Sequence, residues 1–141
     1  MNRKIMTLLL ILIAASAITI VSAADTQTIN GVEFNVPDGY TYDADSASAF
    51  KNVMEDEKVG DVGVFKNSND ELLVIMVYDK DPGVSDLPND YELENKTINN
   101  KNGTLMSAPS RENIGFTYAD GDKYIVIQAM NEDVLKQTII A

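Results

Sequence analysis

RENIGFTYADGDKYIVIQAM, residues Arg111–Met130, places an Asp-Gly pair between two stretches in which apolar side chains recur at every second position. Asp-Gly is a strong hairpin signal, because both residues tolerate the backbone angles of a tight two-residue turn. The stretch therefore predicts a hairpin with one core face. With the turn at Asp120-Gly121, Ile114 lies opposite Ile127 and Phe116 opposite Ile125 on that face, while Gly115, Thr117, Tyr124 and Val126 lie on the other.

A second hairpin is predicted in VGDVGVFKNSNDELLVIMVYDK, residues 59–80, with Ser68-Asn69 as the turn between two apolar runs. This turn sets Val64 opposite Leu73 and Val62 opposite Ile75 on one face, and Phe65 opposite Leu72 on the other. The run from Leu72 to Tyr78 is apolar on both faces, which is typical of a strand inside a sheet that is covered in part on each side.

Two more hairpins are expected, one before residues 59–80 and one after them. Asn30-Gly31 predicts a turn after which Val32, Phe34 and Val36 share a face, and Pro37-Asp38-Gly39 ends that strand. The polar stretch YELENKTINNKNGTLMS, residues 91–107, predicts an edge hairpin that turns near residues 100–103. Just before this polar stretch, residues 81–90 carry two prolines and three aspartates and read as a loop.

Two helices complete the predicted fold. Residues 43–56 place Ala47, Phe50, Val53 and Met54 at helical spacing, with Asp43 or Asp45 available as a cap. Asn131 is a cap for a final helix, EDVLKQTII, whose apolar stripe is Val134, Leu135, Thr138 and Ile139. We expect an α+β domain: an antiparallel sheet of about five to seven strands built from hairpins, packed by one or two helices including a short C-terminal one.

The first 24 residues have the composition of a secretory signal peptide. Basic Arg3 and Lys4 precede the uncharged apolar stretch from Ile5 to Ile20, and the small-residue group VSAAD follows it. We expect cleavage after Ala23 or Ala24, which leaves residues 25–141 as a single domain. The alternative is that the apolar stretch remains as an anchor, although at 16 residues it is shorter than the roughly 20 that span a bilayer.

Composition limits the chemistry that is available to the chain. Removal of Arg3 and Lys4 lowers the basic residues from 11 to nine against 22 acidic ones, a change in net charge from −11 to −13. Such a charge disfavours binding to nucleic acids and to anionic lipid surfaces. The sequence has no cysteine and no histidine, which excludes disulfides, thiolate nucleophiles, a histidine base and an ordinary zinc site.

Carboxylates offer the remaining candidates for metal binding and catalysis. Asp79, Asp81 and Asp86 could supply oxygen ligands to calcium, but the EF-hand pattern fails at Gly83 and Val84, so a solvated loop is favoured and no metal or cofactor is expected. A pair of acids could serve a small hydrolase, yet 22 acids form many pairs by chance, and no serine has a recognisable activating neighbour. We therefore predict no catalytic residue.

Tyrosines and asparagines offer binding and modification sites. Tyr40, Tyr42 and Tyr91 lie in or near predicted loops and Tyr124 on the less apolar face of the last hairpin, where ligand contact competes with packing at the rim of the core. Asn95-Lys96-Thr97 and Asn102-Gly103-Thr104 are N-glycosylation sequons in the polar hairpin, with Asn95 and Asn102 as acceptors if the chain is exported in a glycosylating host.

Three blocks of the chain, INGVEFNVPDGY, KTINNKNGTL and IGFTYADGDKYIVIQAMNEDVLKQTI, resemble small exported proteins of unknown function from methanogenic archaea. The opening order of strand, Pro-x-Gly-aromatic and helix is also similar to the layout of PsbP- and Mog1-like α+β domains, although no functional residue of those families can be matched. The resemblance implies a location at the cell surface or its surroundings and no particular activity.

Together these observations favour an exported, non-enzymatic module that binds or has a structural role at the cell envelope, with an unidentified ligand or protein partner. One alternative is an extracellular hydrolase that depends on carboxylates. Another is an envelope protein that touches the membrane only through an uncleaved N-terminal segment.

Overall fold

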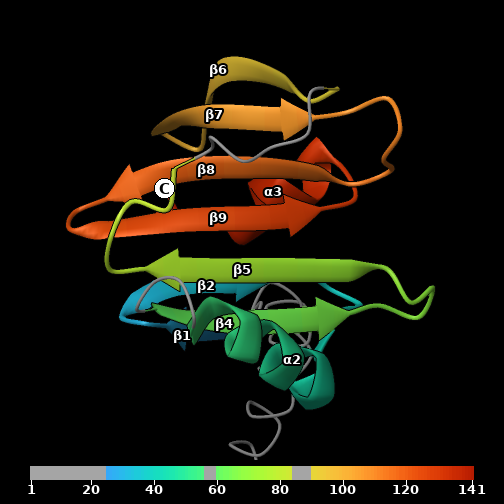
Figure 1. Ribbon diagram of the computed structural model, residues 1–141. Coiled ribbons are helices and arrows are strands. Elements are labelled where there is room, and N and C mark those ends of the chain that lie inside the picture. The colour runs from blue at the N-terminus through green and yellow to red at the C-terminus, as the bar shows by residue number, and fades with distance from the viewer. Residues whose placement is uncertain (1–24, 56–59, 84–89) are drawn as a thin grey trace, which may run out of the picture.

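The computed structural model describes residues 25–55, 60–83 and 90–141, without the side chains of residues 53–55 (Figure 1). These ranges form an α+β fold of nine strands and two helices, which confirms the predicted class. In chain order the elements are β1 (Asp25–Ile29), β2 (Val32–Val36), β3 (Thr41–Tyr42), α2 (Ala44–Glu55), β4 (Gly60–Lys66), β5 (Leu72–Tyr78), β6 (Glu92–Ile98), β7 (Lys101–Ser107), β8 (Ile114–Asp120), β9 (Lys123–Ala129) and α3 (Glu132–Thr138).

Seven of the strands form one antiparallel sheet in the order β3-β4-β5-β9-β8-β7-β6, and β1 and β2 form a separate hairpin. Helix α3 and the β1–β2 hairpin lie on one side of the sheet, whereas α2 lies on the other side beside β4 (Figure 1). The first side is therefore covered along much of its width, and the second is covered by α2 at the β4 end.

The larger core lies between the sheet and the layer made by α3 and β1–β2. Its side chains come from both layers, and Phe34, Phe65, Phe116, Ile125, Ile127 and Leu135 are all almost fully buried. Burial of one such side chain contributes about 1.5–3 kcal/mol. A smaller cluster under α2 contains Ala47, Val62, Val64 and Val74. Strand β5 contributes to both clusters, as its two-sided apolar pattern predicted.

The predicted register of the central hairpin is wrong by one residue. Val64 lies opposite Val74 and Phe65 opposite Leu73, instead of Leu73 and Leu72. The turn contains Asp70 as well as Ser68 and Asn69, because Asp70 adopts a left-handed backbone with φ of 63°. The side chain of Asn67 holds this wider turn by accepting hydrogen bonds from the backbone N–H groups of residues 69 and 71. The extra residue sends Phe65 and Leu73 together into the larger core.

The closing hairpin keeps its predicted faces but not its predicted pairs. Phe116 lies opposite Ile127 and Ile114 opposite Ala129, a shift of two residues on β9. The turn consists of Gly121 and Asp122, since Gly121 has φ of 65° and Asp120 pairs with Lys123 at the end of the strands. A turn with glycine in the first central position is the type II′ alternative to the expected Asp-Gly turn. A shift of two residues leaves each side chain on its own face.

The polar hairpin is the edge of the sheet, as predicted, but it turns earlier than expected. Its turn is Asn99-Asn100, with φ of 48° and 68°, and Gly103 lies inside β7. Asparagine is one of the few residues that tolerates this backbone geometry. The side chain of Asn99 also donates hydrogen bonds to the carbonyl groups of Lys136 and Ile139, at 2.7 and 2.8 Å. It thus satisfies carbonyl groups at the end of α3.

The remaining predicted elements agree with the structure where it describes them. Asn30 and Gly31 form the first turn with φ of 48° and 86°. Asn131 caps α3 by accepting a hydrogen bond from the backbone N–H of Val134 at 3.1 Å. Helix α2 follows Asp43, whose carboxylate accepts a hydrogen bond from the Ser46 hydroxyl. Two predictions lie outside the described residues. These are the packing of Val53 and Met54 and the part of the predicted loop at residues 84–89.

Gly103 fits between β7 and β8 because it has no side chain. A Cβ atom there would meet the carbonyl oxygen of Thr117 and would lie 2.8 Å from Cζ of Phe116. We expect Gly103→Ala to lower the free energy of unfolding by about 1–3 kcal/mol, as overpacking in a sheet core does. Urea denaturation measures the change, with Thr104→Ser as a control that stays within about 0.5 kcal/mol. Equal stabilities of the two variants would contradict the described packing.

Candidate binding face

Strands β6–β9 have one face that no described helix covers. The large core takes alternate residues of these strands, including Ile98, Leu105, Phe116 and Ile127, so the residues between them point to the opposite side. We call this surface the outer face. It consists of Leu93, Asn95, Thr97, Asn102, Thr104, Met106, Gly115, Thr117, Ala119, Tyr124, Val126 and Gln128.

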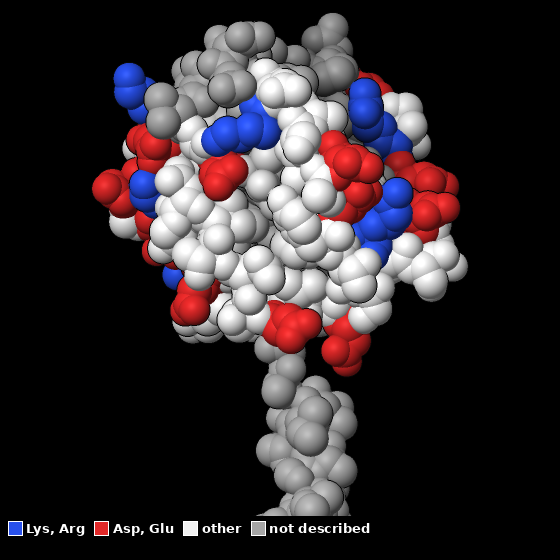
Figure 2. Space-filling view, turned by 90° about the horizontal axis from the view of Figure 1, so that it is seen from below, with Lys and Arg blue, Asp and Glu red and all other residues white. Residues whose placement is uncertain are grey.

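The outer face contains no charged residue, and six of its twelve side chains are threonine, asparagine or glutamine. This is unusual in a chain of which 23% is charged. Seen from the β4 edge, by contrast, acidic and basic side chains are interspersed across the molecule (Figure 2). The acids and lysines of β6–β9 lie at strand ends or point to the core side, so strand alternation separates them from the outer face.

Polar side chains form rows across the outer face. Asn95 lies opposite Thr104, which lies opposite Thr117, and Val126 continues this row on β9. Adjacent strands are roughly 4.8 Å apart, so the hydroxyl and amide groups of a row recur at about that spacing. Most of these side chains are exposed or half-buried, which leaves their donors and acceptors accessible.

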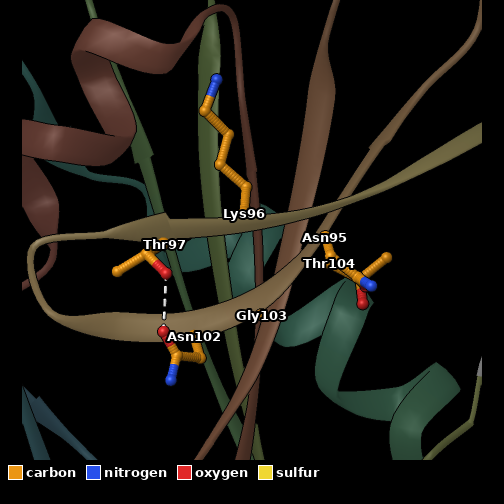
Figure 3. A pocket seen from close by; sticks show the side chains of 6 residues that line it. All are labelled: Asn95, Lys96, Thr97, Asn102, Gly103 and Thr104. Carbon is orange, nitrogen blue, oxygen red and sulfur yellow. Dashed lines mark hydrogen bonds between the residues drawn. The ribbon is translucent and has the colours of Figure 1, made fainter.

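The two sequons face each other across β6 and β7, and their six residues line a hollow of about 550 Å³ (Figure 3). Asn95 lies opposite Thr104 and Thr97 opposite Asn102, so each acceptor asparagine is paired with the threonine of the other sequon. Figure 3 shows Lys96 pointing away from these side chains. Asn95 and Asn102 are exposed, in agreement with the surface position expected for the hairpin.

One of the two acceptor asparagines is engaged in the folded hairpin. The hydroxyl of Thr97 donates a hydrogen bond to Oδ1 of Asn102 at 2.6 Å. Among the described residues no such bond holds the side chain of Asn95. Glycans on either asparagine would project from the β6–β7 half of the outer face.

The opposite, core-side face ends in a row of alternating charges. Nζ of Lys101 on β7 lies 3.4 Å from Oδ2 of Asp120 on β8. Lys123 on β9 lies opposite Asp120, and its Nζ is 2.5 Å from Oδ1 of Asp79. Asn30, in the β1–β2 turn, donates a second hydrogen bond to Asp79 at 3.1 Å. This row therefore joins the sheet to the β1–β2 hairpin.

These contacts change the acid–base behaviour of two members of the row. The hydrogen bond from Lys123, followed by that from Asn30, lowers the pKa of Asp79. The same bond to Asp79 raises the pKa of Lys123. Both shifts favour the charged forms that make the ion pair.

The aspartates considered for calcium have different roles in the described residues. Asp79 forms the ion pair with Lys123. Oδ1 of Asp81 accepts a hydrogen bond from the backbone N–H of Gly83 at 2.9 Å, within the turn. Asp86 lies outside the description, as do the proposed cleavage positions Ala23 and Ala24. No group of three or more acidic residues that could hold a metal ion occurs in the ranges described.

Several acids gather in one groove on the charged side of the molecule. Glu33, Asp120 and Asp122 line about 400 Å³ together with Lys101 and Lys123. Because Asp120 already pairs with Lys101, this arrangement resembles an ion-pair network more than two carboxylates in separate protonation states, which is what acid–base hydrolysis requires.

The four tyrosines proposed for ligand contact do not gather at one site. Tyr40 packs against the core, and burial, followed by the charge of Glu71, raises its pKa. Tyr42 is 56% exposed on the edge strand β3, with its ring 5.7 Å from that of Phe65. Tyr124 lies on the outer face, and Tyr91 lies near one end of it beneath the guanidinium of Arg111. Of the four, only Tyr124 lies on the outer face and only Tyr91 lies beside it.

The outer face as a whole was not predicted from the sequence, although part of it was. The face of the closing hairpin with Gly115, Thr117, Tyr124 and Val126 is confirmed. Its continuation through Thr104 and Asn95 depends on the pairing of β7 with β8, which no local turn signal indicates. The sequence signal that could have identified the whole face is the recurrence of uncharged residues at every second position of β6, β7, β8 and β9.

No family model, curated protein or solved structure matches the chain. The resemblance to exported archaeal proteins and to PsbP- and Mog1-like domains therefore stays a prediction.

Acid should weaken the link between the sheet and the β1–β2 hairpin. Since the pKa of Asp79 is lowered in the folded state, its contribution to stability is present above the unfolded pKa of about 3.9 and is lost as the pH falls through the folded pKa. We expect Asp79→Asn to lower the midpoint temperature of thermal unfolding at neutral pH. Below about pH 4, this midpoint should fall less in the variant than in the original chain. Thermal unfolding across this range tests it.

The exposed Asp38, which forms no ion pair with a described residue, provides the control variant Asp38→Asn. If Asp79→Asn and Asp38→Asn show the same acid dependence as the original chain, the ion pair with Lys123 contributes nothing measurable to the acid response.

Proposed function

We propose that the protein is an exported, non-enzymatic binding module of the cell surface or its surroundings, and that the outer face binds an uncharged saccharide chain. The observation that carries this proposal is an accessible, charge-free sheet face rich in hydroxyl and amide groups on an otherwise acidic domain.

The chemistry of the rows suits sugar hydroxyl groups. Threonine hydroxyls donate and accept hydrogen bonds, and asparagine and glutamine amides do both through separate atoms. Thr104, Thr117 and Gln128 supply these groups at the centre and end of the face. Tyr124 adds an aromatic body with a polar tip, a combination that suits the apolar and polar faces of a sugar ring.

Shape and charge favour an extended neutral ligand. Four strands at roughly 4.8 Å spacing give a surface about 14 Å wide, broad enough for a chain that lies across the strands. A polyanion would be repelled by the net charge, and a polycation would find no carboxylate on the face. An uncharged polar chain meets neither obstacle.

The alternative functions receive less support. A carboxylate hydrolase would use the groove with Glu33, Asp120 and Asp122, in which Asp120 is ion-paired. For a retained anchor, residues 1–24 lie outside the description, and the described residues contain no helix long and apolar enough to cross a membrane.

Mass spectrometry of the protein from its native source tests export. We expect a mature N-terminus at Ala24 or Asp25, because small residues flank the predicted cleavage positions. The mass of a glycan on Asn95 or Asn102 would also show that the β6–β7 hairpin enters a compartment in which asparagine is glycosylated. A peptide that begins at Met1 or contains Ile5 would contradict cleavage and favour the anchored alternative.

Binding to neutral oligosaccharides tests the outer face. Glucan, mannan and N-acetylglucosamine oligomers are titrated into protein made without glycans, and binding is measured by calorimetry. We expect Thr117→Lys to weaken binding at least tenfold, because a long solvated side chain would stand over the central row. Thr28→Lys, on the exposed side of β1, is the matched control and should bind as the original chain does.

Three outcomes contradict the assignment of this face. These are the absence of binding to every oligomer, equal loss of affinity in Thr117→Lys and Thr28→Lys, and concentration-dependent self-association that Thr117→Lys abolishes. The last result would assign the face to contact between copies of the chain.

A further inference from the structure

A small pocket lies at one end of the outer face, where β7 ends and β8 begins. Its volume is about 80 Å³, and its lining includes Tyr91, Met106, Arg111, Asn113, Gly115 and Gln128. Gly115 lies opposite both Met106 and Gln128 in the sheet, so the pocket continues the last row of the outer face. We call it the Arg111 pocket.

Local contacts hold the arginine at this pocket. The guanidinium carbon of Arg111 lies 5.8 Å from the centre of the Tyr91 ring, within the range of a cation–π interaction. The backbone N–H of Arg111 donates to the carbonyl of Ala108 at 3.0 Å in a tight turn. The Ser110 hydroxyl donates to the carboxylate of Asp90, which joins the segment before Tyr91 to the segment before Arg111.

The charge of the pocket is opposite to that of the molecule. Arg111 is the single arginine of residues 25–141, and among the described residues it is the only charged one in the pocket lining. Five lysines form ion pairs with carboxylates among the described residues, whereas Arg111 forms none there. In a domain with such an excess of acids, a guanidinium that is stacked on an aromatic ring and lacks a described carboxylate partner is suited to an anion from outside the chain.

We propose that the Arg111 pocket binds the carboxylate of a single acidic sugar residue in the otherwise uncharged saccharide chain that the outer face binds. The proposal rests on the proposed function of that face. The guanidinium fork matches the two oxygens of a carboxylate. The amide groups of Asn113 and Gln128 are hydrogen-bond donors in the same lining.

The size of the pocket selects the group that enters it. A volume of about 80 Å³ corresponds to two or three water molecules at roughly 30 Å³ each, which suits a carboxylate but not a sugar ring. The ring therefore lies on the adjoining rows, near Met106 and Thr104. A uronic acid in an otherwise uncharged chain has this combination of groups.

Neutral oligosaccharides that carry a single uronic acid residue, and the methyl esters of these oligosaccharides, test the proposal, because esterification removes the charge and retains the ring. Calorimetric titrations use the full chain made without glycans, at about 0.15 M salt, where the repulsion from distant acids is screened beyond about 8 Å. We expect the acid form to bind at least tenfold more tightly than the ester, as charge-assisted hydrogen bonds do. Arg111→Gln should remove this preference.

Lys136→Gln is the matched control, since Lys136 is exposed on α3 and its loss changes the net charge equally. This variant should retain the preference. Circular dichroism verifies that Arg111→Gln is folded. Arg111→Lys, which keeps the charge but loses the planar fork, should keep only part of the preference.

The outcomes separate this proposal from the proposed function. If the acid and ester forms bind equally, or if Arg111→Gln keeps the preference, the carboxylate site is wrong while saccharide binding stands. If neither form binds and the neutral oligomers also fail, saccharide binding by the outer face is wrong. A peptide with a free C-terminal carboxylate, compared with its amide, is the third arm. Preference for that peptide over the oligosaccharide with a single uronic acid would assign the pocket to a protein ligand.

Discussion

The antiparallel pairing of β5 with β9 is the interaction on which the rest of the structure depends. This pair joins the β4–β5 hairpin to the β7–β8–β9 part of the sheet. The side chains that it contributes to the larger core are Ile75, Val77, Ile125 and Ile127. Both helices and the β1–β2 hairpin pack against sheet strands that this pairing holds together. Because α3 and β1–β2 cover one side and α2 covers the other only near β4, the outer face of β6–β9 is left accessible.

Strand alternation then determines the chemistry of the uncovered surface. On β6–β9 the charged side chains lie at strand ends or on the core side, where Lys96 pairs with Glu132 and Lys101 with Asp120. The same alternation directs Asn95, Thr104 and Thr117 outward. The charge-free composition thus originates in the sheet register, and a single-residue slip of β7 or β8 would remove it. The Arg111 pocket, at the end of this surface, adds a positive charge beside it.

The sequence was sufficient to predict the fold class, the hairpin order, the cap of α3 and the faces of the closing hairpin. It was insufficient for the turns of three hairpins, because Asp70, Asn100 and Gly121 all adopt left-handed backbones, so several turns were compatible with the same letters. Gly103 was read as a turn residue, although it lies within β7 against the backbone of β8. That requirement comes from a neighbouring strand and has no local signature. The Arg111 pocket, likewise, joins residues from three separate segments.

Nuclear magnetic resonance measures directly where the ligand lies on the sheet. Backbone amide and side-chain methyl shifts of the isotope-labelled protein would be followed during titration with a neutral oligosaccharide. The account predicts that the shifts concentrate on the outer face, with Thr104, Thr117 and Val126 among the strongest, and that the α3 and β1–β2 layer changes little. Shifts concentrated around Asp79, Lys123 and the β1–β2 turn, or no shifts at a ligand concentration that saturates calorimetric binding, would contradict it.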